Sequence, residues 1–205
     1  SLDIETIFRA TTEELRQVVG SDRVIIYRFN PDWSGNFVAE SVASGWVPLI
    51  QADSKPPKYT EVVLDSPKCI VKLWESPDSL IEDSYLQRTS GGIYNEGEKY
   101  LCVSDIYQAG FSNCYIKLLE TFQVKAYITV PIFCGNKLWG LLATYQNTAP
   151  RLWSAAEINI VVQIGNQLGV ALQQAELLAQ LKLAKEAADA ANKAKSQLLA
   201  RMSHE

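Results

Sequence analysis

Apolar positions along the chain change from helical to strand spacing and back, which predicts an α+β domain. Residues 2–19 repeat apolar side chains at helical spacing until Gly20-Ser21-Asp22 ends the pattern. Later segments rich in β-branched and aromatic residues predict five strands, at 23–29, 35–43, 100–106, 126–133 and 137–146. A further helix is expected at 113–122, between the third and the fourth of these strands. This order is typical of a mostly antiparallel central sheet flanked by helices.

A long stretch between Trp46 and Tyr85 breaks this regularity. It contains five of the eight prolines, so we expect an irregular region with only a short strand at 59–64 and a short helix at 70–74. Long loops inside compact domains tend to be functional. The stretch is therefore a candidate part of a binding site.

The last quarter of the chain predicts one long helix. Ser154 and Glu157 have the spacing of a capping box, and no proline follows before residue 205. The first half of this helix carries apolar residues that we expect to pack on the sheet: Ile158, Val161, Val162, Leu168 and Leu172. Beyond it, apolar and small residues, interrupted by Lys195, recur at alternating steps of four and three: Leu177, Leu181, Ala184, Ala188, Ala191, Lys195, Leu198 and Met202.

This heptad stripe favours a parallel homodimer through residues 177–202. Its alanines and Lys195 make it a weak coiled coil, and a single solvated helix is the alternative. We divide the chain into a globular domain at 1–173 and a signalling helix at 174–205.

Composition narrows the partners. The chain is 47% hydrophobic and 20% charged, which is enough for an ordinary core, and its net charge of -4 provides no basic face for nucleic acid. No apolar run reaches the length of a membrane span, and the first residues lack the features of a signal peptide. We therefore expect a cytoplasmic protein with neither a membrane nor a nucleic-acid partner.

Cysteine and histidine usage excludes several kinds of chemistry. The four cysteines, at 69, 102, 114 and 134, form no C-x-x-C pair, and His204 is the only histidine. A Cys/His zinc site and histidine-dependent catalysis are therefore not expected in the globular part, and the thiols are expected to be reduced.

The end of the chain, Leu198-Leu199-Ala200-Arg201-Met202-Ser203-His204-Glu205, resembles the H-box of sensor histidine kinases. A phospho-acceptor imidazole must project from a helix into solvent, and a neighbouring carboxylate can orient it. The resemblance implies that His204 is phosphorylated by a kinase domain beyond residue 205 and passes the phosphoryl group to a response regulator. Residues 1–205 include no ATP-binding domain, so we expect no enzymatic activity from them alone.

Three further segments carry a second resemblance. The runs 105–120 (DIYQAGFSNCYIKLLE), 124–132 (VKAYITVPI) and 137–142 (KLWGLL) closely resemble cyanobacteriochrome GAF domains. In that family the cysteine that opens this helix, here Cys114, forms a thioether to ring A of a linear tetrapyrrole, or bilin. A helix start lowers the pKa of a thiol, which favours this addition. Taken without its neighbours, Cys114 could instead be a small core residue.

The run Asp83-Ser84-Tyr85-Leu86-Gln87-Arg88-Thr89-Ser90-Gly91-Gly92 resembles the red-absorbing branch of the same family. There the aspartate, here Asp83, hydrogen-bonds the pyrrole nitrogens and balances the charge of a protonated bilin. A helix cap or turn residue is the alternative role. The resemblance also assigns Tyr94, Tyr115 and Leu118 to the bilin pocket.

Four positions depart from the family pattern. Tyr85 replaces the second thiol of the blue-absorbing branch, Tyr115 replaces a histidine, Ile81 a tryptophan and Ile93 an arginine. We therefore expect a red- or far-red-absorbing dark state with a shorter-wavelength photoproduct. The expected cofactor is phycocyanobilin, with biliverdin left open, and Cys69 is an alternative second thiol.

Another hypothesis is a non-photosensory GAF domain that binds a cyclic nucleotide or another small ligand and still regulates a kinase. It would leave Cys114 unmodified, and the sequence contains no glycine-rich loop that could hold a phosphate. A free-standing enzyme is a third hypothesis, which the scarcity of histidine disfavours.

Overall fold

The computed structural model describes residues 3–50, 71–73, 80–83 and 90–204, with residues 71–73, 80–83 and Cys114 described by their backbone. The elements follow the chain in this order: α1 (Ile4–Val19), β1 (Arg23–Phe29), β2 (Gly35–Val42), β3 (Val71–Leu73), β4 (Leu80–Asp83), the 3₁₀ helix η1 (Gly92–Glu96), β5 (Leu101–Val103), α3 (Asn113–Thr121), β6 (Ala126–Cys134), β7 (Lys137–Gln146) and α4 (Ala155–Ser203).

The described strands form one antiparallel sheet in the order β3-β4-β2-β1-β7-β6-β5. The expected α+β fold is therefore confirmed.

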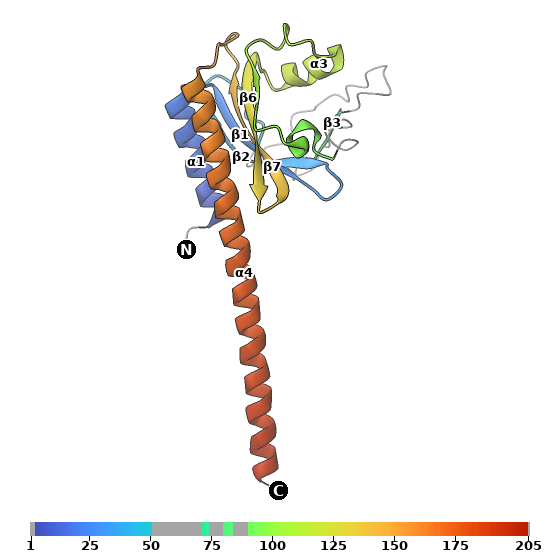
Figure 1. The fold of residues 1–205 in the computed structure, drawn as a ribbon, viewed down its shortest axis with the longest axis vertical. Helices are drawn as coiled ribbons and strands as arrows, with labels where there is room; N and C mark the ends of the chain where they lie inside the picture. Colours follow the sequence, from blue (N-terminus) through green and yellow to red (C-terminus); the bar gives the residue numbers. More distant parts are fainter. Residues whose placement is uncertain (1–2, 51–70, 74–79, 84–89, 205) are drawn as a thin grey trace.

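Helices cover the two faces of the sheet differently. Helices α1 and α4 lie side by side on one face, and α3 lies on the other (Figure 1). Side chains alternate along each strand, so β6 sends Ile128 and Val130 toward α1 and α4 but Tyr127 toward α3. The sheet thus separates two cores, and β6 contributes to both.

Helix α4 approaches β6 closely because two glycines face the strand. A Cβ on Gly169 would lie 2.2 Å from the Phe133 carbonyl oxygen, and one on Gly165 would lie 2.8 Å from a Val130 methyl carbon. Both glycines are buried, one helical turn apart. Any larger residue at position 169 would push the helix off the strand.

Beyond this contact α4 continues as a projecting helix (Figure 1). The residues that pack on the sheet end near Leu172, and the leucines that follow are exposed, Leu177 at 52% and Leu181 at 66%. The expected packing of the first half of the helix is confirmed, as are the capping box and the long helix. Gly20, with a φ of 68°, ends α1 as expected.

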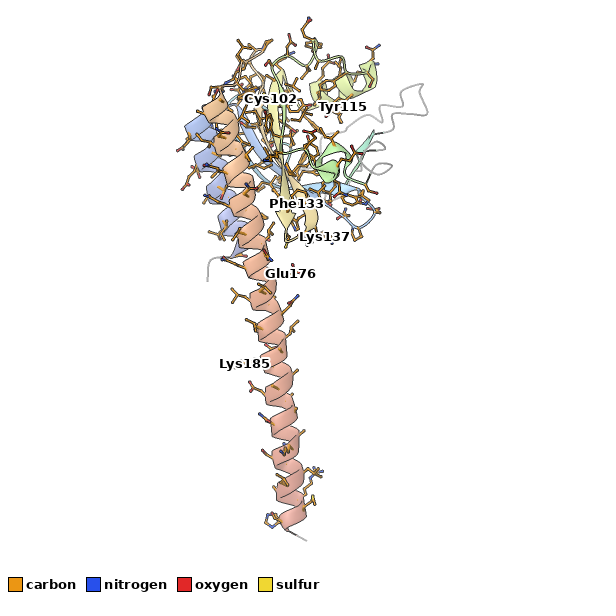
Figure 2. The ribbon with its side chains drawn as sticks, in the orientation of Figure 1. Cys102, Tyr115, Phe133, Lys137, Glu176 and Lys185 are labelled. Atoms are coloured by element: carbon orange, nitrogen blue, oxygen red, sulfur yellow. The ribbon has the colours of Figure 1, made fainter. Side chains whose placement is uncertain are left out.

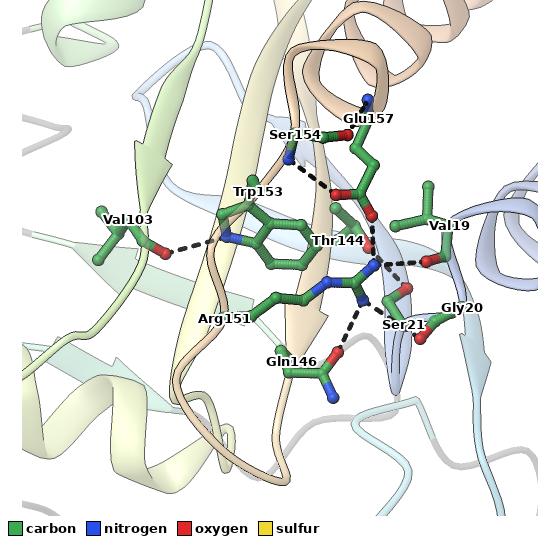
Figure 3. Close-up of polar contacts among 10 residues, drawn as sticks. All are labelled: Val19, Gly20, Ser21, Val103, Thr144, Gln146, Arg151, Trp153, Ser154 and Glu157. Atoms are coloured by element: carbon green, nitrogen blue, oxygen red, sulfur yellow. Dashed lines mark hydrogen bonds and ion pairs between the residues drawn. The ribbon is translucent and has the colours of Figure 1, made fainter.

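The start of α4 is tied to the sheet by a compact polar contact, which we call the Arg151 latch (Figure 3). The Arg151 guanidinium donates to the carbonyl oxygens of Val19 and Gly20, at 2.7 and 3.2 Å, and pairs with Glu157. Its backbone N–H donates to Ser104, and the neighbouring Trp153 Nε1 donates to the Val103 carbonyl at 3.1 Å. The latch joins the end of α1, the end of β5 and the first turn of α4.

Glu157 is anionic in this setting. Partial burial alone would raise the pKa of its carboxyl group, but the Ser154 N–H and the Arg151 charge hold that pKa below the ordinary 4.5. The contribution of Glu157 to stability is therefore complete above pH 4.5 and is lost as the pH falls through the lowered value.

Three expectations need correction. Residues 71–73 form strand β3 rather than part of a helix at 70–74, because they pair with the next strand, β4, which the sequence did not suggest. The strand expected at 100–106 ends at Val103, because the Val103 and Ser104 carbonyls accept from Trp153 and Arg151 of the latch. The helical spacing within 2–19 placed Val18 on the apolar face, but Val18 is 67% exposed, and the buried residues of α1 are Phe8, Thr12, Leu15 and Val19. The short strand expected at 59–64 lies outside the described residues.

Among the described residues, none of the helices has the length and hydropathy that a bilayer span needs.

The latch predicts a specific effect of Arg151→Ala. We expect the free energy of unfolding to fall by about 1–3 kcal/mol, because several partly buried acceptors and Glu157 lose their donor. Hydrogen–deuterium exchange at the first turn of α4 should accelerate. In urea titrations, the difference in the free energy of unfolding between the variant and the wild type should become smaller below pH 4.5, where Glu157 becomes protonated.

Arg201→Ala is the matched control, since Arg201 lies exposed in the last turn of the same helix. Equal exchange at the start of α4 in both variants would show that the latch does not hold the helix.

Candidate functional site

Four tyrosines from four elements converge on the α3 side of the sheet. This tyrosine cluster consists of Tyr94 of η1, Tyr115 of α3, Tyr127 of β6 and Tyr145 of β7, and all four belong to or pack against one core. Tyr127 and Tyr145 are direct partners in the β6–β7 register, with ring centroids 6.2 Å apart. Tyr94 and Tyr115 both lie near enough to influence the ionisation of Tyr127.

Aromatic rings surround the cluster. Phe111 meets Tyr115 edge to face at 4.8 Å and stacks over Tyr127 at 6.5 Å. Leu118, on the same helix as Tyr115, packs against this core as well. Figure 2 shows Tyr115 on the α3 side of the sheet, away from α4. The site is therefore a mainly aromatic region with phenol groups inside it.

Burial keeps the two strand tyrosines neutral. It raises the pKa of Tyr127 strongly, with further increases from Tyr115, Tyr94 and Tyr145, and it also raises the pKa of Tyr145. Both therefore carry an O–H that can donate a hydrogen bond.

A buried ion pair lies beside the cluster. Arg23 is the β1 neighbour of Tyr145, and its guanidinium pairs with Glu40 at 2.6 Å. The Glu40 carboxylate also accepts from the backbone N–H groups of Leu49 and Ile50. The charge of Arg23 is thus balanced within the protein.

Helix α3 places Cys114 beside the cluster. The Ser112 hydroxyl caps the helix by accepting from the Tyr115 N–H at 3.3 Å, so Cys114 is the second helical residue. The Cys114 side chain is outside the described part, but its backbone directly precedes that of Tyr115. The Cys114 backbone thus lies in the first turn of α3, directly before a residue of the tyrosine cluster.

Asp83 is the last residue of β4, and its backbone pairs with Val71 of β3. Its side chain, and the whole of Cys69 and Tyr85, lie outside the described residues. The structure thus brings Tyr94, Tyr115 and Leu118 together and leaves the expected role of Asp83 a prediction.

His204 lies far from these residues, at the exposed C-terminal end of α4 (Figure 1).

The sequence prediction missed Tyr127 and Tyr145. Ile128, next to Tyr127, and Leu142, three positions before Tyr145, belong to the opposite core, so the period of two did contain the signal. Their direct pairing depended on the register of β6 and β7, which the short Gly135-Asn136 turn sets together with a register shift between Ile132 and Phe133.

Comparison with known proteins agrees with this geometry. The family model for the GAF domain matches residues 3–172. The structure resembles the photoproduct state of GAF3 from Slr1393 of Synechocystis sp. PCC6803, with 45% identity and a TM-score of 0.70 over 87% of this chain and 99% of that one. It also resembles the red-light-absorbing state of NpR6012g4, a red/green cyanobacteriochrome, with 47% identity and a TM-score of 0.69 over 86% and 98%.

A third similar structure is the far-red-absorbing dark state of JSC1_58120g3 with bound biliverdin IXa. It is 36% identical, with a TM-score of 0.65 over 85% of this chain and 92% of that one.

The circadian input-output histidine kinase CikA of Synechococcus elongatus is 28% identical over 100% of this chain but only 28% of its own length. The chain spans between 16% and 29% of the length of four curated relatives that include this kinase. The family match, the fold and the cysteine-bearing helix beside an aromatic core lead to one conclusion. The chain belongs to the GAF-domain family and resembles, within it, the bilin-binding photosensory domains of cyanobacteriochromes.

Proposed function

We propose that this chain is a photosensory domain that holds a bilin through a thioether to Cys114 and controls a histidine kinase through α4. The observation that carries the proposal is the position of Cys114, at the capped N-terminus of α3 and next to the tyrosine cluster. A bilin held there would supply light absorption and a double bond between its C and D rings that light can isomerise. The residues of the aromatic region position it and respond to it.

The aromatic region has the chemistry that a bilin requires. A flat conjugated ligand favours aromatic faces such as those of Phe111 and Tyr115, and its polar edges need hydrogen-bond donors. The Tyr127 hydroxyl is a buried donor without a hydrogen-bond partner among the described residues. Similar structures that hold biliverdin or phycocyanobilin support this assignment.

The colour of the dark state depends on residues that adjust the charge of the bilin. We propose that the Asp83 carboxylate balances a protonated bilin and that Tyr115 serves in place of the family histidine, which gives a red or far-red dark state. Phycocyanobilin is the proposed cofactor. Biliverdin is the alternative, which the biliverdin-bound relative supports.

The exposed part of α4 is the proposed route by which the domain transmits its signal. An isolated helix without tertiary contacts gains little stability, so exposed leucines such as Leu177, Leu181 and Leu198 call for a partner. We propose a parallel homodimer through residues 177–202, in which light changes the helix register or splay at His204. The phosphoryl group would then pass to a response regulator. Similarity to CikA supports the kinase context.

Covalent attachment is tested by Cys114→Ala in cells that produce phycocyanobilin. We expect the variant to lose the zinc-fluorescent band on a denaturing gel, because the thioether that resists denaturation cannot form. Cys102→Ala and Cys134→Ala are matched controls that should keep the band, since Cys102 packs on the α1 and α4 side and Cys134 donates to Glu176. Colour that persists in denatured Cys114→Ala would contradict the assignment.

The role of Asp83 is tested by Asp83→Asn in the bilin-bound domain. Removing the counter-charge should lower the apparent pKa of the protonated bilin, so the long-wavelength band should weaken at a lower pH than in the wild type. The measurement is an absorption titration against pH. Asp32→Asn, in the β1–β2 turn, is the control and should titrate like the wild type. An unchanged titration in Asp83→Asn would place Asp83 outside the pocket.

The role of α4 is tested by insertions near Ala187 in the full-length kinase. One, two or three added residues rotate the downstream helix by about 100° each, so light control of His204 phosphorylation should change with insert length. A seven-residue insertion keeps the heptad phase and is the matched control. The absorption changes should survive in every variant. Identical light control for every insert would show that α4 is not the signalling route.

A further inference from the structure

Tyr127 has an unusual place in the tyrosine cluster. Its side chain is 2% exposed, and its hydroxyl makes no hydrogen bond to any described residue. Tyr115 approaches it, but without the geometry of a hydrogen bond. A buried hydroxyl without a partner destabilises a folded protein, and a phenylalanine would fill nearly the same space without that cost.

The position of Tyr127 points to a ligand. It projects from β6 toward α3, where Phe111 stacks on its ring and Tyr115 directly follows Cys114 in the chain. A ligand attached at Cys114 would therefore start next to a residue that shares the aromatic core with Tyr127.

The electrostatic environment of the Tyr127 hydroxyl favours a neutral hydrogen-bond acceptor. The cluster belongs to a hydrophobic core of aromatic and aliphatic side chains, and the Arg23 charge beside Tyr145 is already paired with Glu40. A carboxylate placed here would be buried without a counter-ion, which is costly. A carbonyl oxygen would gain a hydrogen bond at no such cost.

We propose that the Tyr127 hydroxyl donates a hydrogen bond to a lactam carbonyl oxygen on a terminal ring of the bilin and so positions that ring. This inference rests on the proposed function, because it assumes a bilin at Cys114. Burial keeps the phenol protonated, and it therefore acts as donor over the physiological pH range. Tyr127 also lies on the strand whose other face carries α4, so the ring that it positions is one strand away from the output helix.

Tyr127→Phe tests the proposal through two measurements. In the bilin-bound protein, the infrared band of one lactam carbonyl should move to higher wavenumber, and the visible absorption peak should shift, because the carbonyl loses its donor. In the bilin-free protein, the midpoint of thermal unfolding should stay the same or rise, because the variant removes an unpaired hydroxyl.

Tyr27→Phe is the matched control. Tyr27 is a buried phenol on the same face, but its oxygen lies over Gly35, where an added Cβ would come within 2.3 Å of it. This variant should leave the carbonyl band and the visible spectrum unchanged.

The outcomes separate this inference from the proposed function. A coloured wild type with an unchanged carbonyl band in Tyr127→Phe overturns the role of Tyr127 and leaves the bilin assignment intact. A lower unfolding midpoint without bilin, together with an unchanged band, would assign Tyr127 a purely structural role. A wild type that takes up no bilin would refute the proposed function itself.

Discussion

The close approach of α4 to β6 is the constraint on which the rest of the structure depends. Gly169 lets the helix backbone come so near the Phe133 carbonyl that even an alanine would clash there. At this separation, side chains such as Val161 and Leu168 fill the core between helix and sheet. Because the interior is close-packed, a displacement of β6 cannot be absorbed locally and must be met by α4 or by the strands beside it.

The same strand carries the site on its opposite face. Tyr127 lies in the aromatic core under α3, and its neighbour Ile128 lies in the core under α4. The Arg151 latch provides a second connection, since it ties the end of β5 to the first turn of α4, and the chain continues from β5 toward α3. A ligand that repacks the tyrosine cluster therefore has two short physical routes to α4. One is the packing of β6 against α4, and the other is the set of hydrogen bonds in the Arg151 latch.

Local signals in the sequence were sufficient for the long helix and most of the sheet, but not for the pairing of its short strands. The Ser154 and Glu157 capping box and the strand at 126–133 are encoded within a few residues, and both were predicted. Strand β3 was mistaken for a helix because it has only three residues and its pairing with β4 defines it. In the site, Tyr115 and Leu118 came from a motif, whereas Tyr127 required the strand register to be noticed.

Absorption spectra before and after illumination test the proposed photosensory function most directly. The protein should be purified from cells that make phycocyanobilin. Its spectrum should be recorded in the dark, then after red light, and finally after either a dark period or illumination at a wavelength that the photoproduct absorbs. A photosensory domain of the proposed kind should show a red or far-red band that falls under red light while a shorter-wavelength band grows, and that recovers afterwards. A colourless protein, a violet or blue resting band, or a spectrum that light does not change would contradict this function.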